Sequence, residues 1–321
     1  MISRRLLRIK ALMALYAFNR RDDNDLVLAE KELLFSIGKT YDLYHYILLL
    51  IVELADVTGE KIDIALRKRM PSPEDLDPNR RFSNNLFIKQ LRDNSDLKKY
   101  LLSKKISWAN HKEIPRTLYN KMQKWEPYIE YMNAGKSSYN ADKKIISRLV
   151  TEFFVASDDL HTGFEEQSIF WNDDLEYVAA MIEKTFRKFK NEPGYQAPLM
   201  PLYRNDDDEQ YVKELFRKVV LRTNECSELI DRNTTNWEVE RIALMDILVM
   251  QMAITEIIEF PEIPVKVTLN EYIEIAKYYC TSKSSTFVNG ILDKVVREMR
   301  EKGTLLKTGR GLIGDLAEDT D

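Results

Sequence analysis

Apolar residues recur at helical spacing along most of the chain. At the start, Ile2, Leu6, Ile9, Met13 and Tyr16 follow one another at three- or four-residue intervals, which predicts an opening helix with one apolar face. The same spacing predicts helices within residues 30–57, 84–132, 142–190, 209–230, 237–260, 267–279 and 285–301. The pattern therefore predicts an all-α protein.

Stretches that contain proline and glycine separate these helical blocks. Three prolines fall within residues 71–78, and the run 192–208, with a glycine and three further prolines, is the clearest boundary. The longest strongly apolar block, residues 43–55, contains Glu53 and is too short to cross a bilayer. We therefore expect it to be a buried helix.

A gapless alignment of the chain with itself places Trp171 on Trp237, Asp142 on Asp208 and Leu149 on Leu215. Identities are few, so either a decayed duplication or chance agreement between amphipathic helices explains the match. The tryptophan spacing favours duplication. A duplication predicts that residues 142–190 superpose on residues 208–256.

The composition fits a globular protein of about two domains, with 44% hydrophobic and 31% charged residues among 321. A net charge of -4 excludes a globally basic nucleic-acid binder, but it allows a local basic patch. The two cysteines, Cys226 and Cys280, lie far apart, which argues against a disulfide framework and a cysteine-rich zinc site. Arg8 and Lys10 interrupt the opening apolar residues, so the start is a poor secretory signal and a cytoplasmic location is expected.

Motifs for catalysis or for a cofactor are weak in this sequence. The histidines at 45, 111 and 161 are isolated, so structural or surface roles are expected and no metal is implied. Residues 309–314 match the dinucleotide-binding glycine pattern but have no strand before them and no room for a helix after them. The acids at 206–209 fit helix capping. We therefore expect neither a cofactor nor enzyme activity.

Two segments could bind nucleic acid. Residues 1–21 contain six basic residues and no acid, and Arg4, Arg5 and Arg8 are placed to contact successive phosphates, although a solvated helix face would look the same. Residues 282–286, with three serines, a threonine and Lys283, lead into a helix that begins near Phe287. They could form a phosphate seat with a stacking ring, and serine capping with a core phenylalanine is the alternative.

These same segments resemble the NusB family of transcription antitermination factors. Residues 264–277, PVKVTLNEYIEIAK, are similar to the family's proline, lysine, Asn-Glu and Glu-Leu-Ala-Lys segment, and residues 287–294, FVNGILDK, reproduce its Phe-Val-Asn-Gly helix. Residues 4–8 and 14–16 resemble its arginine-rich first helix and Ala-Leu-Tyr continuation. Leu6 stands where some members have a further arginine, which predicts one phosphate contact fewer. Close resemblance covers residues 1–21 and 208–300.

The resemblance implies two helical bundles around a shared first helix, formed by residues 1–24 and 205–303. Residues 25–204 would be a helical insertion of the kind found in long Bacteroidetes forms, and residues 304–321 a flexible tail. The implied function is to bind the single-stranded boxA-type RNA of ribosomal transcripts together with the ribosomal protein NusE, and to load both onto elongating RNA polymerase. The residues expected to contact RNA are Arg4, Arg5, Arg8, Lys283, Ser284, Phe287 and Asn289.

Tyr16 and Asp246 align with family positions that face NusE, whereas Gln251 stands where arginine often occurs. Lys283 replaces a commonly acidic position, which would favour RNA. Two other functions remain open. One is a helical protein-protein scaffold that binds no RNA, and the other is the RNA-binding module of ribosomal RNA cytosine methyltransferases, which would need a separate cofactor-binding domain.

Overall fold

A computed structural model of the chain describes residues 2–22, 24–234, 242–281 and 284–313. Within these ranges the regular secondary structure is helical, and the β-type pairing is a single bridge between Ile2 and Tyr203. The prediction of an all-α fold is confirmed. In the same ranges, no helix has both the length and the apolar character that a bilayer span requires.

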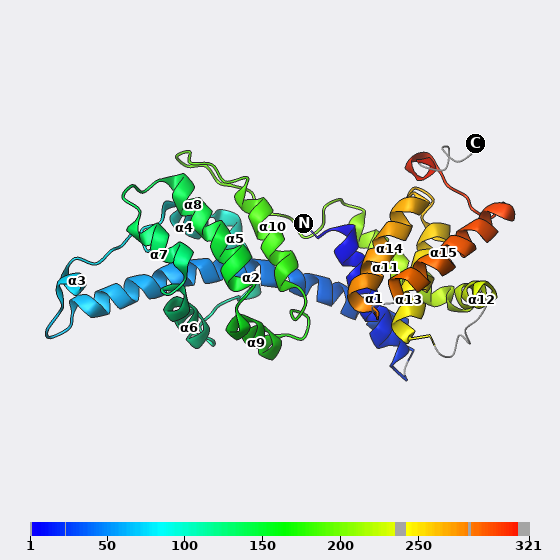
Figure 1. Cartoon of the computed structure of the whole chain (residues 1–321), viewed down its shortest axis with the longest axis horizontal. Coiled ribbons are helices and arrows are strands. Elements are labelled where there is room, and N and C mark those ends of the chain that lie inside the picture. Colours follow the sequence, from blue (N-terminus) through cyan, green and yellow to red (C-terminus); the bar gives the residue numbers. More distant parts are fainter. Residues whose placement is uncertain (1, 23, 235–241, 282–283, 314–321) are drawn as a thin grey trace. The chain divides into compact units, whose positions relative to one another are not determined.

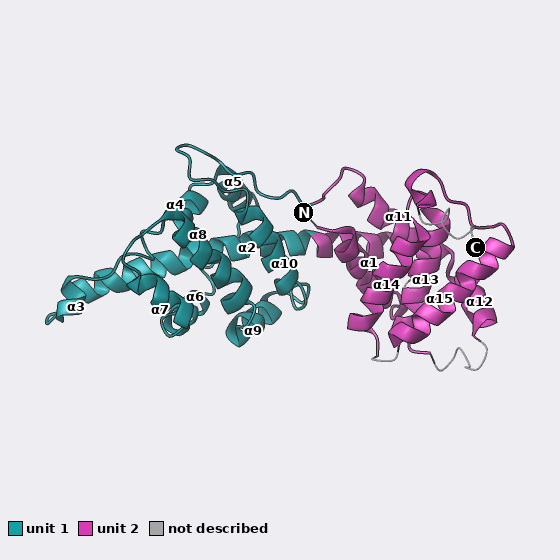
Figure 2. Ribbon diagram, turned by 45° about the horizontal axis from the view of Figure 1, so that its top comes forward, with its two compact units in different colours: residues 1, 38–202 teal, residues 2–37, 203–321 magenta. Residues whose placement is uncertain are grey.

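The chain divides into two units (Figures 1 and 2). Unit 1 comprises residues 38–202, and unit 2 comprises residues 2–37 and 203–321. The long helix α2 (Leu26–Leu66) contributes its first twelve residues to unit 2 and the remainder to unit 1. The predicted boundaries are at 24/25 and 204/205, whereas the two units are divided at 37/38 and 202/203. The first boundary differs because α2 begins at Leu26 and continues without a break across position 37/38.

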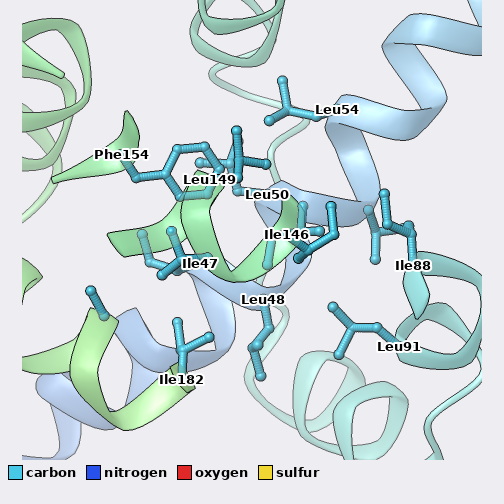
Figure 3. Packing of buried hydrophobic residues seen from close by; sticks show 14 of the residues in the cluster. Ile47, Leu48, Leu50, Leu54, Ile88, Leu91, Ile146, Leu149, Phe154 and Ile182 are labelled. Atoms are coloured by element: carbon cyan, nitrogen blue, oxygen red, sulfur yellow. The ribbon is translucent and has the colours of Figure 1, made fainter. Parts of the chain in front are cut away.

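Unit 1 is built around α2. Its further helices are α3 (Pro73–Leu76), α4 (Leu86–Arg92), α5 (Ser95–Lys104), α6 (Glu113–Met122), α7 (Glu126–Asn133), α8 (Tyr139–Arg148), the π-helix η1 (Leu149–Phe154), α9 (Asp158–Gln167) and α10 (Leu175–Phe186). The apolar block 43–55 is buried in α2, as predicted, and meets side chains such as Ile88 of α4, Ile146 of α8 and Ile182 of α10 (Figure 3). Unit 1 therefore has a hydrophobic core of its own.

Unit 2 is built around α13 (Leu244–Glu259), which contacts all of the helices that surround it. These are α1 (Arg4–Asn19), α11 (Asp208–Leu221), α12 (Thr223–Asn233), α14 (Val265–Tyr279) and α15 (Ser284–Glu301). Residues 248–257 of α13 are all buried, because neighbours cover the helix on all sides. Residues 235–241, which include Trp237 and the predicted start of this helix, lie outside the described part.

The opening helix buries the predicted face only at its start. Ser3 caps α1 by accepting a hydrogen bond from the backbone N–H of Leu6. Ile2 and Leu6 of the predicted face are buried, but Ile9, Met13 and Tyr16 are only half-buried. The core residues along the rest of the helix are Leu7, Ala11, Leu12, Leu15 and Phe18. Both stripes are apolar, so periodicity alone could not choose between them. The choice decides where Arg8 lies, because Arg8 is next to Leu7 and one turn before Leu12.

The segment predicted to be a flexible tail is in part fixed to unit 2. The Lys307 ammonium donates to the carbonyl oxygens of Ile257 (2.8 Å) and Phe260 (3.1 Å) at the end of α13. Gly311, in the 3₁₀ helix Gly309–Leu312, lies so close to Pro261 that a Cβ would be 1.9 Å from the Pro261 carbonyl oxygen. The prediction is therefore wrong for residues 304–313, and residues 314–321 lie outside the described part.

The predicted duplication has partial support in the helix bounds. With Trp171 laid on Trp237, α8 and η1 fall on α11, α9 falls on α12, and α10 overlaps α13. The packing differs, because α9 lies mainly against α6, whereas α12 packs on α13 and α15. Since Trp237 is outside the described residues, the duplication stays a prediction.

Candidate nucleic-acid interface

Arg8 is buried in unit 2 and does not lie on the surface. Its guanidinium group donates from Nε to Glu256 Oε2 and from Nη2 to Glu256 Oε1, both at 2.8 Å. Only 4% of the Arg8 side chain and none of the Glu256 side chain is exposed. The structure therefore contradicts the expectation that Arg8 contacts RNA, and it makes Arg8 the residue that ties α1 to α13.

Glu256 is the centre of a fully hydrogen-bonded polar network in the core. Besides Arg8, its carboxylate accepts from the hydroxyls of Tyr211 (2.6 Å), Thr268 (2.8 Å) and Tyr272 (3.1 Å). Burial alone would raise the pKa of Glu256, but the Arg8 charge and these hydrogen bonds together lower it. Burial, with a further contribution from the Glu256 charge, raises the pKa of Tyr211 and of Tyr272, so both remain neutral donors.

Arg4 lies at the surface, at the start of α1. Its Nη2 contacts Asp207 Oδ2 at 2.8 Å and its Nε contacts Asp208 Oδ1 at 3.0 Å, while the guanidinium carbon is 4.6 Å from the centre of the Tyr211 ring. About a third of the side chain, 34%, is exposed. The ring and the two acids hold the guanidinium group in place, and one edge of it still faces solvent.

The acids that hold Arg4 do not act as the helix caps that their sequence suggests. Asp207 is at the N-cap position of α11 without a side-chain capping bond. Buried Asp208 accepts from the backbone N–H groups of Arg204 and Asn205, which precede the helix, as well as from Arg4. Their role is to fasten the loop before α11 and the start of α1 to each other.

Arg5 is the most exposed of the three arginines, with 48% of its side chain accessible. It forms a two-bond ion pair with Glu271 of α14, from Nε and Nη2 at 2.8 Å each. The hydrogen bond to Glu271 is the main cause that raises the pKa of Arg5. Glu271 occupies the Nε edge of the guanidinium group, so the Nη1 edge is the one that faces away from α14.

The second predicted segment, at the start of α15, is only partly on the surface. Phe287 and Asn289 are half-buried, and Asn289 donates to Asp293 at 3.1 Å. Ser284 is buried and donates to Asp246 Oδ2 at 2.7 Å. An inward-facing Ser284 contradicts the expected RNA contact, and Lys283 lies outside the described residues.

The residues expected to face NusE differ in exposure. Tyr16 is half-buried on α1, with the Arg20 guanidinium carbon 5.4 Å from its ring centre. Asp246 is buried, and its carboxylate accepts a hydrogen bond from the Ser284 hydroxyl, which joins α13 to α15. Gln251 is buried as well and donates to Ser227 at 3.0 Å. Tyr16 thus remains a surface candidate, whereas Asp246 and Gln251 are internal.

One exposed aromatic residue, Tyr278 of α14, was not among the residues that the sequence motifs indicated. Its side chain is 80% exposed. Glu271, Glu274 and Tyr278 follow one another at helical spacing, so they form one stripe that runs from the Arg5 contact toward the start of α15. The helical spacing of these three positions was visible in the sequence, but nothing there showed that Tyr278 is exposed to solvent.

Comparisons with known proteins agree on one family. The family model described as the NusB family matches residues 175–297. A protein of Salinibacter ruber, "Transcription antitermination protein NusB", is 43% identical over 115 residues, which cover 36% of this chain and 72% of that protein. The proteins of the same name from Chloroherpeton thalassium and Natranaerobius thermophilus are 42% and 32% identical, over 32% and 30% of this chain and 49% and 70% of their own lengths.

A solved structure of T. maritima NusB is also similar, with 22% sequence identity. It covers 50% of this chain and 95% of that chain, at a TM-score of 0.30. The match to the family model covers the end of unit 1, from α10 onward, and the unit 2 helices α11 to α15.

Proposed function

The chain belongs to the NusB family, and on that premise we propose that it is a transcription antitermination factor. It would bind single-stranded boxA-type RNA of ribosomal transcripts together with the ribosomal protein NusE, in the cytoplasm and on the elongating RNA polymerase complex. The proposal is for a binding protein, with no cofactor or metal in its mechanism.

The observation on which the RNA contact rests is the placement of Arg4 and Arg5. Both lie at the start of α1 with part of the guanidinium group exposed, and Tyr211 or an ion pair holds each one in a fixed orientation. Guanidinium groups that are already oriented lose little side-chain entropy when they bind a phosphate bidentately. Both arginines are already paired with carboxylates, Arg4 with Asp207 and Asp208 and Arg5 with Glu271, so a phosphate has to compete with these partners. Partly exposed ion pairs contribute little energy, which makes this exchange possible.

Arg8 contributes to this surface indirectly. Its buried pair with Glu256 fixes α1 against α13, and α1 presents Arg4 and Arg5 one helical turn away. Arg8 is therefore a positioning residue in the proposal, and the arginines that meet phosphate are Arg4 and Arg5 alone.

Base stacking would come from the other end of α14. Tyr278 is exposed on the stripe that begins at Glu271, and half-buried Phe287 follows on α15. Aromatic side chains stack on unpaired bases of any sequence, at about 1 to 3 kcal/mol per base. We therefore place the RNA backbone at Arg4 and Arg5, and bases at Phe287 and Tyr278, with Asn289 and Lys283 as further candidates for contact.

The NusE contact is assigned to the outer side of α1, around Tyr16. A partly buried tyrosine that already packs with a neighbouring arginine is a common kind of interface anchor. Asp246 is buried and hydrogen-bonded to Ser284, so the proposal assigns it no direct contact with NusE.

A titration of labelled RNA tests the proposal. The full chain should bind a boxA-type RNA more tightly than a scrambled RNA of equal length, and NusE should increase the affinity further. Equal binding of the two RNAs with and without NusE would contradict it and would favour a helical scaffold that does not read RNA.

A further inference from the structure

A group of basic side chains surrounds the end of α10 in unit 1. Residues 184–191 contain four cations and no acid, and Lys143 of α8 reaches the same place, where its ammonium donates to the Phe189 carbonyl oxygen at 3.0 Å. We call Lys143, Arg187, Lys188 and Lys190 the α10-end cluster. Helices α8 and α10 pack against each other there, as Figure 1 also shows.

Carboxylates compensate this cluster only weakly. Arg187 pairs with Glu183 one turn earlier, and 70% of the arginine side chain remains exposed. Lys190 is 3.9 Å from Glu192 with 61% of its side chain exposed. Burial lowers the pKa of Lys143, and no carboxylate acts in the opposite direction. Exposed ion pairs of this kind contribute little energy, so an incoming anion can displace them.

The backbone beneath the cluster is packed against the core of unit 1. Phe186 and Phe189 pack against Phe87 of α4, with ring centres 4.7 and 5.1 Å from it. The Tyr195 hydroxyl donates to the Lys188 carbonyl oxygen, and its ring centre lies 5.6 Å from the Lys190 ammonium. The cations therefore lie on a well-packed part of unit 1, and an aromatic ring lies beside Lys190.

Stabilisation of the helix end explains only part of this arrangement. A cation near a helix C-terminus is favoured by the helix dipole within the last turn, and Lys143, bound to a carbonyl oxygen, fits that role. Arg187, Lys188 and Lys190 are exposed. Three exposed cations within four residues exceed what the dipole requires.

We propose that the α10-end cluster is a second RNA-binding surface, which contacts the phosphate backbone without reading sequence. Lysine and arginine side chains around a half-buried tyrosine match the basic surface with interleaved aromatics that single-stranded RNA requires. The choice of RNA over an acidic protein segment rests on the proposed function of the chain as an RNA-binding factor. The cluster would give the segment between α1 and α11 a role in holding RNA that flanks the specific element.

The test uses the full chain and a fluorescein-labelled oligouridylate of about 30 nucleotides, which has the backbone but not the boxA sequence and is long enough to span more than one single-strand site. The variant combines Arg187→Gln, Lys188→Gln and Lys190→Gln. Its control combines Lys98→Gln, Lys99→Gln and Lys104→Gln on α5, which removes the same charge from exposed positions of the same unit, one of them also in a weak ion pair.

The cluster variant should bind oligouridylate on the order of 100-fold more weakly at about 0.1 M salt, with a log-log salt slope flatter by about 2, or roughly 0.7 for each phosphate that the protein no longer neutralises. The control should bind like the parent chain. A variant with Lys188→Arg and Lys190→Arg keeps the charges and should also bind like the parent. Equal affinity and slope for the cluster variant and its control would overturn the proposal.

Two further measurements separate this proposal from others. If the cluster variant loses binding of polyglutamate but not of oligouridylate, the surface binds acidic proteins and the RNA proposal is wrong. Arg4→Ala and Arg5→Ala should weaken the binding of the short boxA-type RNA, whereas the cluster variant should weaken the binding of oligouridylate. A failure of boxA selectivity would therefore leave the oligouridylate result interpretable.

Discussion

The substitution Glu256→Gln tests whether the buried network fixes α1. It removes the charge that balances Arg8, whose side chain is 4% exposed, and replaces one acceptor oxygen by an amide nitrogen. The Tyr211, Thr268 and Tyr272 hydroxyls can rotate to accept from that nitrogen, but a guanidinium group has no acceptor. Removing one partner of a buried ion pair costs about 3 to 5 kcal/mol. That is a large share of the roughly 5 to 15 kcal/mol by which domains are stable.

An exposed pair in unit 1 offers a matched control. Arg148 and Glu152 form a pair with the same two-bond geometry as Arg8 and Glu256, but 35% of the Arg148 side chain and 47% of the Glu152 side chain are exposed. Exposed pairs contribute about 0 to 1 kcal/mol, so Glu152→Gln should leave the stability nearly unchanged. Urea unfolding followed by circular dichroism measures both variants. Similar losses for the two, or a loss below about 1 kcal/mol for Glu256→Gln, would refute the reasoning from burial.

Three further predictions concern binding, pH and packing. Glu271→Gln removes a carboxylate that competes with phosphate, while the amide oxygen can still accept a hydrogen bond from Arg5 and keep it oriented, so the affinity for boxA-type RNA should rise; an unchanged or lower affinity in fluorescence anisotropy would contradict this. Burial lowers the pKa of His45 to about 4, whereas an unfolded histidine titrates near 6.5. As pH falls from about 6.5 to 4, the unfolded state binds the extra proton, so up to about 3 kcal/mol of stability should be lost in that window. His45→Phe should flatten this part of the plot of unfolding free energy against pH. Gly311→Ala places a Cβ 1.9 Å from the Pro261 carbonyl oxygen and should cost roughly 1 to 3 kcal/mol, while Gly290→Ala, which meets nothing within 4 Å, should leave the melting temperature the same or higher.

The helical class and the approximate position of most helices followed from the sequence, because an apolar repeat of three and four residues reflects burial of one helix face. The limits of α2 did not follow from the sequence. Residues 26–66 form one helix, although the apolar signal weakens after residue 57, because the end of α2 is largely exposed.

The candidate site was predictable only where the contacts are local. Arg4 and Arg5 are at the surface as expected, but Arg8 is buried because Glu256, 248 positions later, supplies its counter-charge. A partner so distant in sequence leaves no local signal. Ser284 and Asp246 were misplaced for the same reason, since each was assigned to a surface and they hydrogen-bond to each other inside unit 2. The fixed segment 304–313 was missed because its contacts at Lys307 and Gly311 are with the end of α13.

The combined variant Arg4→Ala and Arg5→Ala tests the central claim most directly, by titration of boxA-type RNA at several salt concentrations. Arg67→Ala with Arg69→Ala, at exposed positions just beyond the end of α2, removes the same charge from unit 1 and serves as the control. The account predicts weaker binding for the Arg4 and Arg5 variant, with a log-log salt slope flatter by about 1.4, or roughly 0.7 for each arginine, and parental binding for the control. Unchanged affinity and slope in a variant that melts like the parent would contradict the assignment of α1 to the RNA surface.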